Sequence, residues 1–235
     1  MRKLLQAIIL AGLAAAAMPA AAAEGRRSLL VLGDSLASGL GLALRGLAAR
    51  EGDVRVVIRA QPGTGLARSD VLDWPQRLAE ILARERFDAA VILIGSNDRQ
   101  SIFFRDRRPL HWDTPSWKAQ YAARIDTMIR ILKDAGAMVV WVGLPVMRHA
   151  GYSAAMGDLS ALFRERAAAA CAAFVDLAAL TAGPDGAFTA EIADADGEPR
   201  LARAGDGVHF TVTGYRIAAA AVIEALRHDV VACAR

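Results

Sequence analysis

Residues 29–40 read Leu29-Leu30-Val31-Leu32-Gly33-Asp34-Ser35-Leu36-Ala37-Ser38-Gly39-Leu40, and the rest of the chain is organised around this stretch. The continuous apolar run predicts a buried parallel strand, and the Gly-Asp-Ser that follows predicts a turn into a helix. Ser35 would then stand at a helix N-terminus, in the crevice where open α/β sheets bind ligands. Such a serine suits nucleophilic attack on an acyl carbon, although a serine that only caps the helix fits the same residues.

The first residues have the pattern of a secretory signal peptide. Arg2 and Lys3 form a basic end, residues 4–17 form an apolar core, and residues 21–23 form a small-residue cleavage site. The core is shorter than the roughly 20 residues that span a bilayer, which disfavours the alternative of a membrane anchor. We therefore expect residues 1–23 to be removed, leaving a periplasmic or secreted single domain over residues 24–235 with no membrane span.

Charge and cysteine content limit the classes of partner and linkage. The 28 Lys and Arg nearly balance the 25 Asp and Glu, with a net charge of +3 and no dense basic run, so the sequence gives no support for nucleic-acid binding. In an oxidising compartment Cys171 and Cys233 are able to form a disulfide, and two buried thiols are the equal alternative. Neither cysteine has the spacing of metal ligands.

Apolar strands alternate with helical patterns along the chain. Strands are expected at 29–32, 54–60, 88–94, 137–143 and 173–177, and helices at 36–50, 71–86, 116–135, 159–171 and 213–232. Residues 181–205 hold turn formers and predict loops or a small hairpin. The alternation predicts an α/β fold whose parallel sheet is covered on both faces and connected by right-handed crossovers.

A serine nucleophile needs a base, and the base needs a carboxylate that orients it. Asp206-Gly207-Val208-His209 stands just before the last helix. A spacing of three in a tight turn can bring the Asp206 carboxylate to one ring nitrogen of His209 and leave the other nitrogen for Ser35. Without Ser35, a loop aspartate and a loop histidine of no function would be the favoured interpretation.

The developing oxyanion needs hydrogen-bond donors, which the loops after two further strands can supply. Gly63 or Gly65, after the second strand, offers a backbone N–H, and Asn97, after the third, offers a side-chain amide. Each also has an ordinary interpretation as a turn residue.

Together these segments resemble the SGNH (GDSL-like) hydrolase superfamily. The blocks of that superfamily appear in family order as Gly33-Asp34-Ser35-Leu36, Gly95-Ser96-Asn97-Asp98 and Asp206-Gly207-Val208-His209. Three further segments are similar to an exported bacterial subgroup of uncharacterised function: Thr64-Gly65-Leu66-Ala67-Arg68, Asp73-Trp74-Pro75 and Gly207-Val208-His209-Phe210-Thr211.

The resemblance implies a three-layer α/β/α sandwich with a flavodoxin-like five-stranded parallel sheet. It implies Ser35 as the nucleophile, His209 as the base and Asp206 as its partner. The oxyanion hole it implies consists of the Ser35 N–H, the N–H of Gly63 or Gly65, and the Asn97 amide. It implies no metal and no cofactor.

The connection from 99 to 115 is longer than most connections in a compact domain. Its aromatic and basic side chains are suited to stack on a sugar ring or to hold an anionic substrate, and a solvated loop anchored by its aromatics is the alternative. The residues expected at a substrate rim are Phe103, Phe104, Arg105, His111 and Trp112.

The expected activity is that of an exported serine esterase, which removes an acyl group through an acyl-serine intermediate. The aromatic and basic rim favours a small O-acyl group on an envelope glycan over a long-chain lipid. Two alternatives remain open. One is an O-acyltransferase that uses the same triad, and the other is a non-catalytic glycan-binding or assembly module on the same fold.

Overall fold

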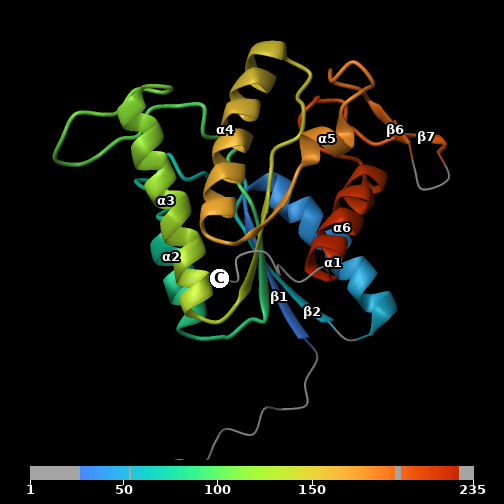
Figure 1. Cartoon of the computed structure of the whole chain (residues 1–235), viewed down its shortest axis with the longest axis horizontal. Coiled ribbons are helices and arrows are strands. Elements are labelled where there is room, and N and C mark those ends of the chain that lie inside the picture. The colour runs from blue at the N-terminus through green and yellow to red at the C-terminus, as the bar shows by residue number, and fades with distance from the viewer. Residues whose placement is uncertain (1–26, 53, 194–196, 228–235) are drawn as a thin grey trace, which may run out of the picture.

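Five parallel strands form the central sheet of the computed structural model (Figure 1). The strands are β1 (Arg27–Gly33), β2 (Val54–Ala60), β3 (Ala89–Leu93), β4 (Met138–Val142) and β5 (Ala173–Val175). Their order is β2-β1-β3-β4-β5, and Val31 of β1 lies opposite Ile58 on one side and Val91 on the other. This order is that of a flavodoxin-like sheet and confirms the predicted fold class.

The structure describes residues 27–52, 54–193 and 197–227. The expected leader, residues 1–23, and Cys233 lie outside the described residues. Cys171 is not a free thiol; its pairing with Cys233 and the cleavage of the leader stay predictions. No helix in the described part of the chain is long and apolar enough to cross a membrane.

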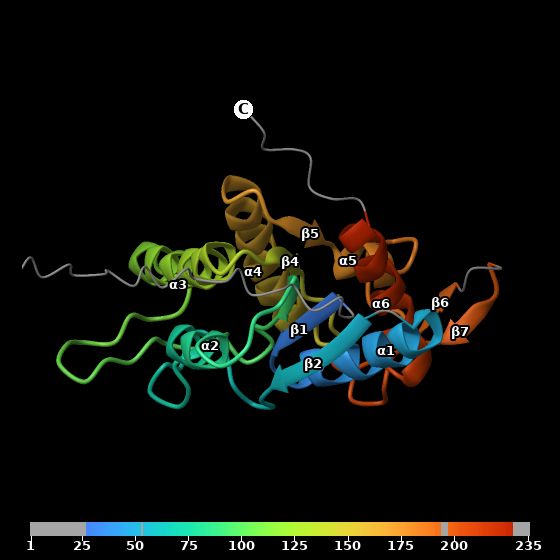
Figure 2. The ribbon, with the colours of Figure 1, turned by 90° about the horizontal axis from the view of Figure 1, so that it is seen from below.

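Helices cover both faces of the sheet (Figure 2). Helices α1 (Ser35–Glu51) and α6 (Val212–Arg227) lie on one face, and α2 (Trp74–Leu82), α3 (Pro115–Asp134) and α4 (Ala150–Ala169) lie on the other. After β5 come the short helix α5 (Leu177–Thr181) and an antiparallel hairpin of β6 (Glu191–Ala193) and β7 (Pro199–Leu201). The three layers and the hairpin within 181–205 agree with the sequence analysis.

The core lies where the apolar sequence pattern places it. Leu30, Val31 and Leu32 of β1 have no exposed surface. On α3 the predicted apolar face is buried in full, and it consists of Tyr121, Ile125, Met128, Ile129 and Leu132. Burial of each such side chain contributes about 1.5–3 kcal/mol, so the contact of α3 with the sheet is set by the spacing of these residues.

Two helix boundaries differ from the sequence prediction. Helix α2 is shorter than the predicted 71–86, because the Asp73 side chain accepts the Gln76 N–H and caps the helix there. Helix α4 begins at Ala150, well before the predicted start at 159. Gly151 and Gly157 lower the helix propensity of this segment, so its first turns are formed with help from packing against the sheet.

The ends of β1 and β3 are held close together at the C-terminal edge of the sheet. Gly33 has φ +139°, and a Cβ there would lie 1.8 Å from the carbonyl oxygen of Leu93. Only glycine fits this approach. The segments that follow, which begin with Asp34 and Ile94, therefore leave the sheet side by side.

Candidate active site

Ser35, His209 and Asp206 form a continuous chain of hydrogen bonds. The Ser35 Oγ lies 2.8 Å from His209 Nε2, and His209 Nδ1 lies 2.7 Å from Asp206 Oδ2. Ser35 is the first residue of α1, and the other two come from the turn before α6, 174 positions further along for His209. The structure thus brings together the three residues that the sequence pointed to, in the geometry that nucleophile activation requires.

Asp34, and not Ser35, caps helix α1. Its side chain accepts the Leu36 N–H at 2.9 Å, so the interpretation of Ser35 as a capping residue is wrong. The same carboxylate accepts three further bonds, from Gly95 N–H at 3.1 Å, from Ser96 N–H at 3.0 Å and from Ser96 Oγ at 2.8 Å. Complete burial raises the pKa of Asp34 to about 6. The Asp34 carboxylate therefore ties the start of α1 to the loop that carries Asn97.

The turn from Asp206 to His209 is preorganised by its own backbone. Asp206 Oδ1 accepts the N–H groups of Val208 at 2.8 Å and of His209 at 2.9 Å, which leaves Oδ2 for the imidazole. Partial burial acts to raise the pKa of Asp206, but these backbone bonds and His209 outweigh it and lower the pKa to about 2. The Asp206 carboxylate is therefore ionised at neutral pH. Gly207 has φ +74°, and a Cβ there would lie 2.5 Å from the Cβ of Arg148.

The buried side chain of Arg203 holds this turn through hydrogen bonds to its backbone carbonyls. Its side chain is only 2 % exposed, and its guanidinium donates to the carbonyls of Val146 at 2.6 Å, Val208 at 3.0 Å and Gly207 at 3.4 Å. It also stacks on Phe210, 4.6 Å from the ring centre. Loss of solvation lowers the pKa of Arg203 to about 10. Sequence reasoning missed this residue, because a lone arginine in a loop gives no hint that it will be buried.

Asn97 joins the loop after β3 to the loop after β2. Its Nδ2 donates to the Thr64 carbonyl at 2.9 Å and lies 3.4 Å from Ser96 Oγ. Thr64 is itself fixed, since its Oγ1 accepts the Trp74 Nε1–H at 3.2 Å and donates to the Gln61 carbonyl at 2.7 Å. The Asn97 amide is therefore oriented before any ligand binds, as an oxyanion donor requires.

The two glycines of the second block have different surroundings. Gly65 is buried, and a Cβ there would lie 2.0 Å from Asp98 Oδ1, so packing explains the lack of a side chain. Gly63 is exposed at φ +75°, and a Cβ there would meet nothing within 4 Å.

Asp98 is a second buried carboxylate that sequence reasoning missed. It accepts the Leu66 N–H at 2.7 Å and the Tyr121 hydroxyl at 2.7 Å and so fixes the loop.

Three of the five expected rim residues line one hollow. The segment from 99 to 113 turns back on itself, with Ile102 and Leu110 exchanging two backbone hydrogen bonds of 2.9 Å. Phe103, Phe104 and Arg105 line a hollow of about 600 Å³ together with Ser69, Asp70 and Asp106. The residues that line this hollow do not include the triad or Asn97.

The other two expected rim residues have local partners. His111 Nδ1 lies 3.4 Å from Ser101 Oγ. Trp112 packs edge-on against Trp117 with ring centres 4.6 Å apart, and it faces a different hollow, between α3 and α4. The structure therefore does not group His111 and Trp112 with the hollow at Phe103.

Residues 27–52, 54–193 and 197–227 contain no cluster of three or more His, Cys, Asp or Glu side chains that could hold a metal ion. The polar groups at the sheet edge pair with one another and with backbone groups. They include a serine hydroxyl hydrogen-bonded to an imidazole, a carboxylate that orients this imidazole, and a side-chain amide, which is an arrangement that can carry out acyl transfer.

The chain matches one family model and is similar to several solved structures. Residues 28–225 match the model of a family described as a protein of unknown function, DUF459. No curated protein matches the chain. Among solved structures, a protein from Slackia heliotrinireducens proposed to be an SGNH hydrolase is 24 % identical with a TM-score of 0.58, over 86 % of this chain and 100 % of that one.

Two further solved structures are similar over almost their whole length. TesA is 21 % identical with a TM-score of 0.57, over 86 % of this chain and 98 % of its own. Axe2, an acetylxylan esterase from Geobacillus stearothermophilus, is 19 % identical with a TM-score of 0.60, over 89 % of this chain and 99 % of its own. At these identities the likeness shows the fold, and this chain has the fold of the SGNH hydrolases.

Proposed function

Because this chain belongs to the DUF459 family and has the fold of the SGNH hydrolases, we propose that it is a serine esterase. The observation that carries the proposal is the chain of hydrogen bonds from Ser35 through His209 to Asp206, at 2.8 and 2.7 Å. A binding module has no need for a serine, a histidine and an ionised aspartate in this order. The non-catalytic alternative leaves this geometry without an explanation.

In the proposed reaction, the Ser35 Oγ attacks the ester carbonyl while His209 Nε2 takes the hydroxyl proton. Asp206 holds the Nδ1–H tautomer of His209 and stabilises the imidazolium that forms. The tetrahedral intermediate collapses to an acyl-serine as His209 donates its proton to the leaving alcohol. A water molecule, activated by His209, then releases the carboxylic acid and restores the Ser35 hydroxyl.

The oxyanion of the tetrahedral intermediate is held by three donors in this proposal. They are the N–H of Ser35 at the start of α1, the amide of Asn97 and the N–H of Gly63. The Ser35 and Gly63 N–H groups donate to no acceptor in the part of the chain that the structure describes. Gly63 is preferred to Gly65, because Gly63 is exposed at the loop surface whereas Gly65 is buried against Asp98.

The proposed substrate is a glycan that carries a small O-acyl group, met outside the cytoplasm after cleavage of residues 1–23. The support is the leader sequence together with the hollow at Phe103, Phe104 and Arg105, where aromatic faces and a guanidinium suit a sugar. That Axe2 is named an acetylxylan esterase agrees with this substrate class. The start of the mature chain at Glu24 would be read by mass spectrometry of the exported protein.

A paired comparison of substrates tests the proposal. The triple variant Phe103→Ala, Phe104→Ala, Arg105→Ala is expected to lose at least tenfold in kcat/KM on an acetylated oligosaccharide and less than threefold on p-nitrophenyl acetate. Equal losses of kcat/KM on both substrates would show that the residues of the hollow support the structure of the active site and do not bind the sugar. No loss on either substrate would refute the proposed glycan substrate. Acyl transfer to a sugar alcohol faster than to water would assign the chain to the acyltransferases instead.

A further inference from the structure

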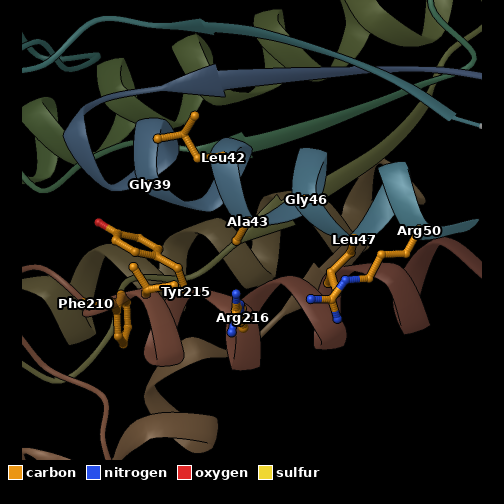
Figure 3. Close-up of a pocket in the computed structure, with 10 residues that line it drawn as sticks. Gly39, Leu42, Ala43, Gly46, Leu47, Arg50, Phe210, Tyr215 and Arg216 are labelled. Atoms are coloured by element: carbon orange, nitrogen blue, oxygen red, sulfur yellow. The ribbon is translucent and has the colours of Figure 1, made fainter.

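A groove between α1 and α6 is lined by none of the three triad residues. It has a volume of about 340 Å³ and is lined mainly by apolar groups (Figure 3). Its floor on the α1 side is made of small residues, Gly39, Ala43 and Gly46. Two of its exposed wall residues are large and apolar, Leu42 at 62 % and Val212 at 69 % exposure.

Two aromatic rings form part of the groove wall. Phe210 and Tyr215 line the groove and stand with their ring centres 5.3 Å apart. The Tyr215 ring lies against Gly39, where a Cβ would come within 2.1 Å of it. Neither Ser35 nor His209 lines the groove, so it is not the site of the chemistry proposed above.

Gly46 marks the open part of the groove. A glycine inside a helix lowers stability relative to alanine. Gly39 and Gly41 of the same helix have close contacts, with Tyr215 and Ile58. A Cβ at Gly46 would meet nothing within 4 Å. Gly46 therefore leaves open space on the groove side of α1, which a larger side chain at this position would fill.

Two guanidinium groups give the groove its charge. Figure 3 shows Arg50 reaching from α1 toward α6 and Arg216 standing on α6 itself. Neither arginine forms an ion pair with a carboxylate in residues 27–52, 54–193 and 197–227. An apolar groove with two unpaired cations beside it is complementary to a molecule with an apolar body and an anionic head.

We infer that the groove between α1 and α6 binds an anionic amphiphile with a single alkyl chain. The chain lies over Ala43 and Gly46, and the carboxylate pairs with Arg50 and Arg216. The groove volume of about 340 Å³ lies in the range of small-molecule sites, about 300–1,000 Å³. The size of the groove therefore fits a small molecule.

Binding of straight-chain carboxylates at pH 7, measured by isothermal titration calorimetry, tests the inference. Decanoate is expected to bind with one site per chain, and affinity is expected to rise about fourfold for each methylene from hexanoate to decanoate. Arg50→Gln with Arg216→Gln should weaken decanoate at least tenfold and 1-decanol less than threefold.

Substitution of Gly46 distinguishes an effect on ligand binding in the groove from an effect on folding. Gly46→Leu places a side chain in the open space and raises helix propensity, so the variant is expected to fold and to bind decanoate at least tenfold more weakly. Gly157→Leu is the matched control, because Gly157 lies inside α4 and also has nothing within 4 Å of a Cβ. This control should bind decanoate as the wild type does.

Three results would overturn the inference: no saturable binding of decanoate to the wild type, equal binding by wild type and Gly46→Leu, or a dimer that Gly46→Leu dissociates. The dimer, seen by analytical ultracentrifugation, would assign the groove to a second copy of the chain. Labelling of Ser35 by a fluorophosphonate reports on the esterase proposal separately, so failure of one proposal leaves the other to be judged on its own data.

Discussion

Replacement of Asp206 by asparagine tests the orientation of the histidine without breaking the turn. The amide oxygen of asparagine can still accept the Val208 and His209 N–H groups, which Asp206 Oδ1 accepts at 2.8 and 2.9 Å. The amide nitrogen would face His209 Nδ1 as a donor. His209 would then carry its proton on Nε2 and could no longer accept the proton of Ser35.

The size of the effect follows from two terms. At 2.7 Å the carboxylate stabilises an imidazolium by about 1.5 kcal/mol at the dielectric constant of water, which is about tenfold in rate. The wrong tautomer adds to this, and in buried triads the whole loss is about 10⁴-fold. Because the Asp206 side chain is 50 % exposed, we expect an intermediate loss of about 10³ in kcat.

The assay is hydrolysis of p-nitrophenyl acetate at pH 7.5, with the melting temperature measured beside it. Asp185→Asn is the matched control, because Asp185 also accepts a backbone N–H two residues ahead, from Ala187 at 3.0 Å, and has no histidine partner in the described chain. That control should keep its activity within twofold. A loss below threefold for Asp206→Asn, with an unchanged melting temperature, would refute the role given to Asp206.

Three further expectations follow from the contacts of the site. Asn97→Ala should lower kcat by about 10²–10³ with little change in KM, since its amide bonds most strongly to the charge of the transition state; an effect on KM alone would make it a substrate-binding residue. Arg203→Lys keeps the charge and loses the planar fork, so kcat should fall at least tenfold. Arg130→Lys, at an exposed position on α3, should stay within twofold, and equal effects of the two changes would contradict a positioning role for Arg203. The folded state retains the Asp34 proton up to about pH 6 and the unfolded state releases it near 3.8, so the stability that this proton provides is complete below 3.8 and is lost as pH rises through 6. Urea unfolding from pH 3.5 to 7 should therefore show a decline about 3 kcal/mol larger in the wild type than in Asp34→Asn, and parallel curves would exclude it.

The sequence carried enough information for the sheet and the triad. The strand at 54–60 was predicted to the residue, because a run bounded by turn formers and filled with valine and isoleucine has few other solutions. The turn at Asp206 was predicted from a spacing of three, which its own backbone bonds realise. The strand and the turn both depend on residues close together in the sequence, and such local patterns can be recognised from a single sequence.

What the sequence did not reveal depends on burial at long range. Arg203 and Asp98 look like loop residues, and only the tertiary structure shows that each is buried among backbone groups of distant segments. Trp112 was expected at the substrate rim, but aromatic residues in a long loop fit a rim and a local core equally well. The start of α4 was missed because Gly151 and Gly157 lower the helix propensity of its first turns, which packing stabilises in the folded chain.

In the proposed reaction, Ser35 is a nucleophile activated by His209. Incubation with a fluorophosphonate, followed by peptide mass spectrometry, measures this directly. We expect one adduct, on the peptide that contains Ser35. It should form at least 10²-fold more slowly in His209→Ala and be absent in Ser35→Ala, which should melt within a few degrees of the wild type. An adduct on another residue, or wild-type hydrolysis of p-nitrophenyl acetate by Ser35→Ala, would contradict this role of Ser35.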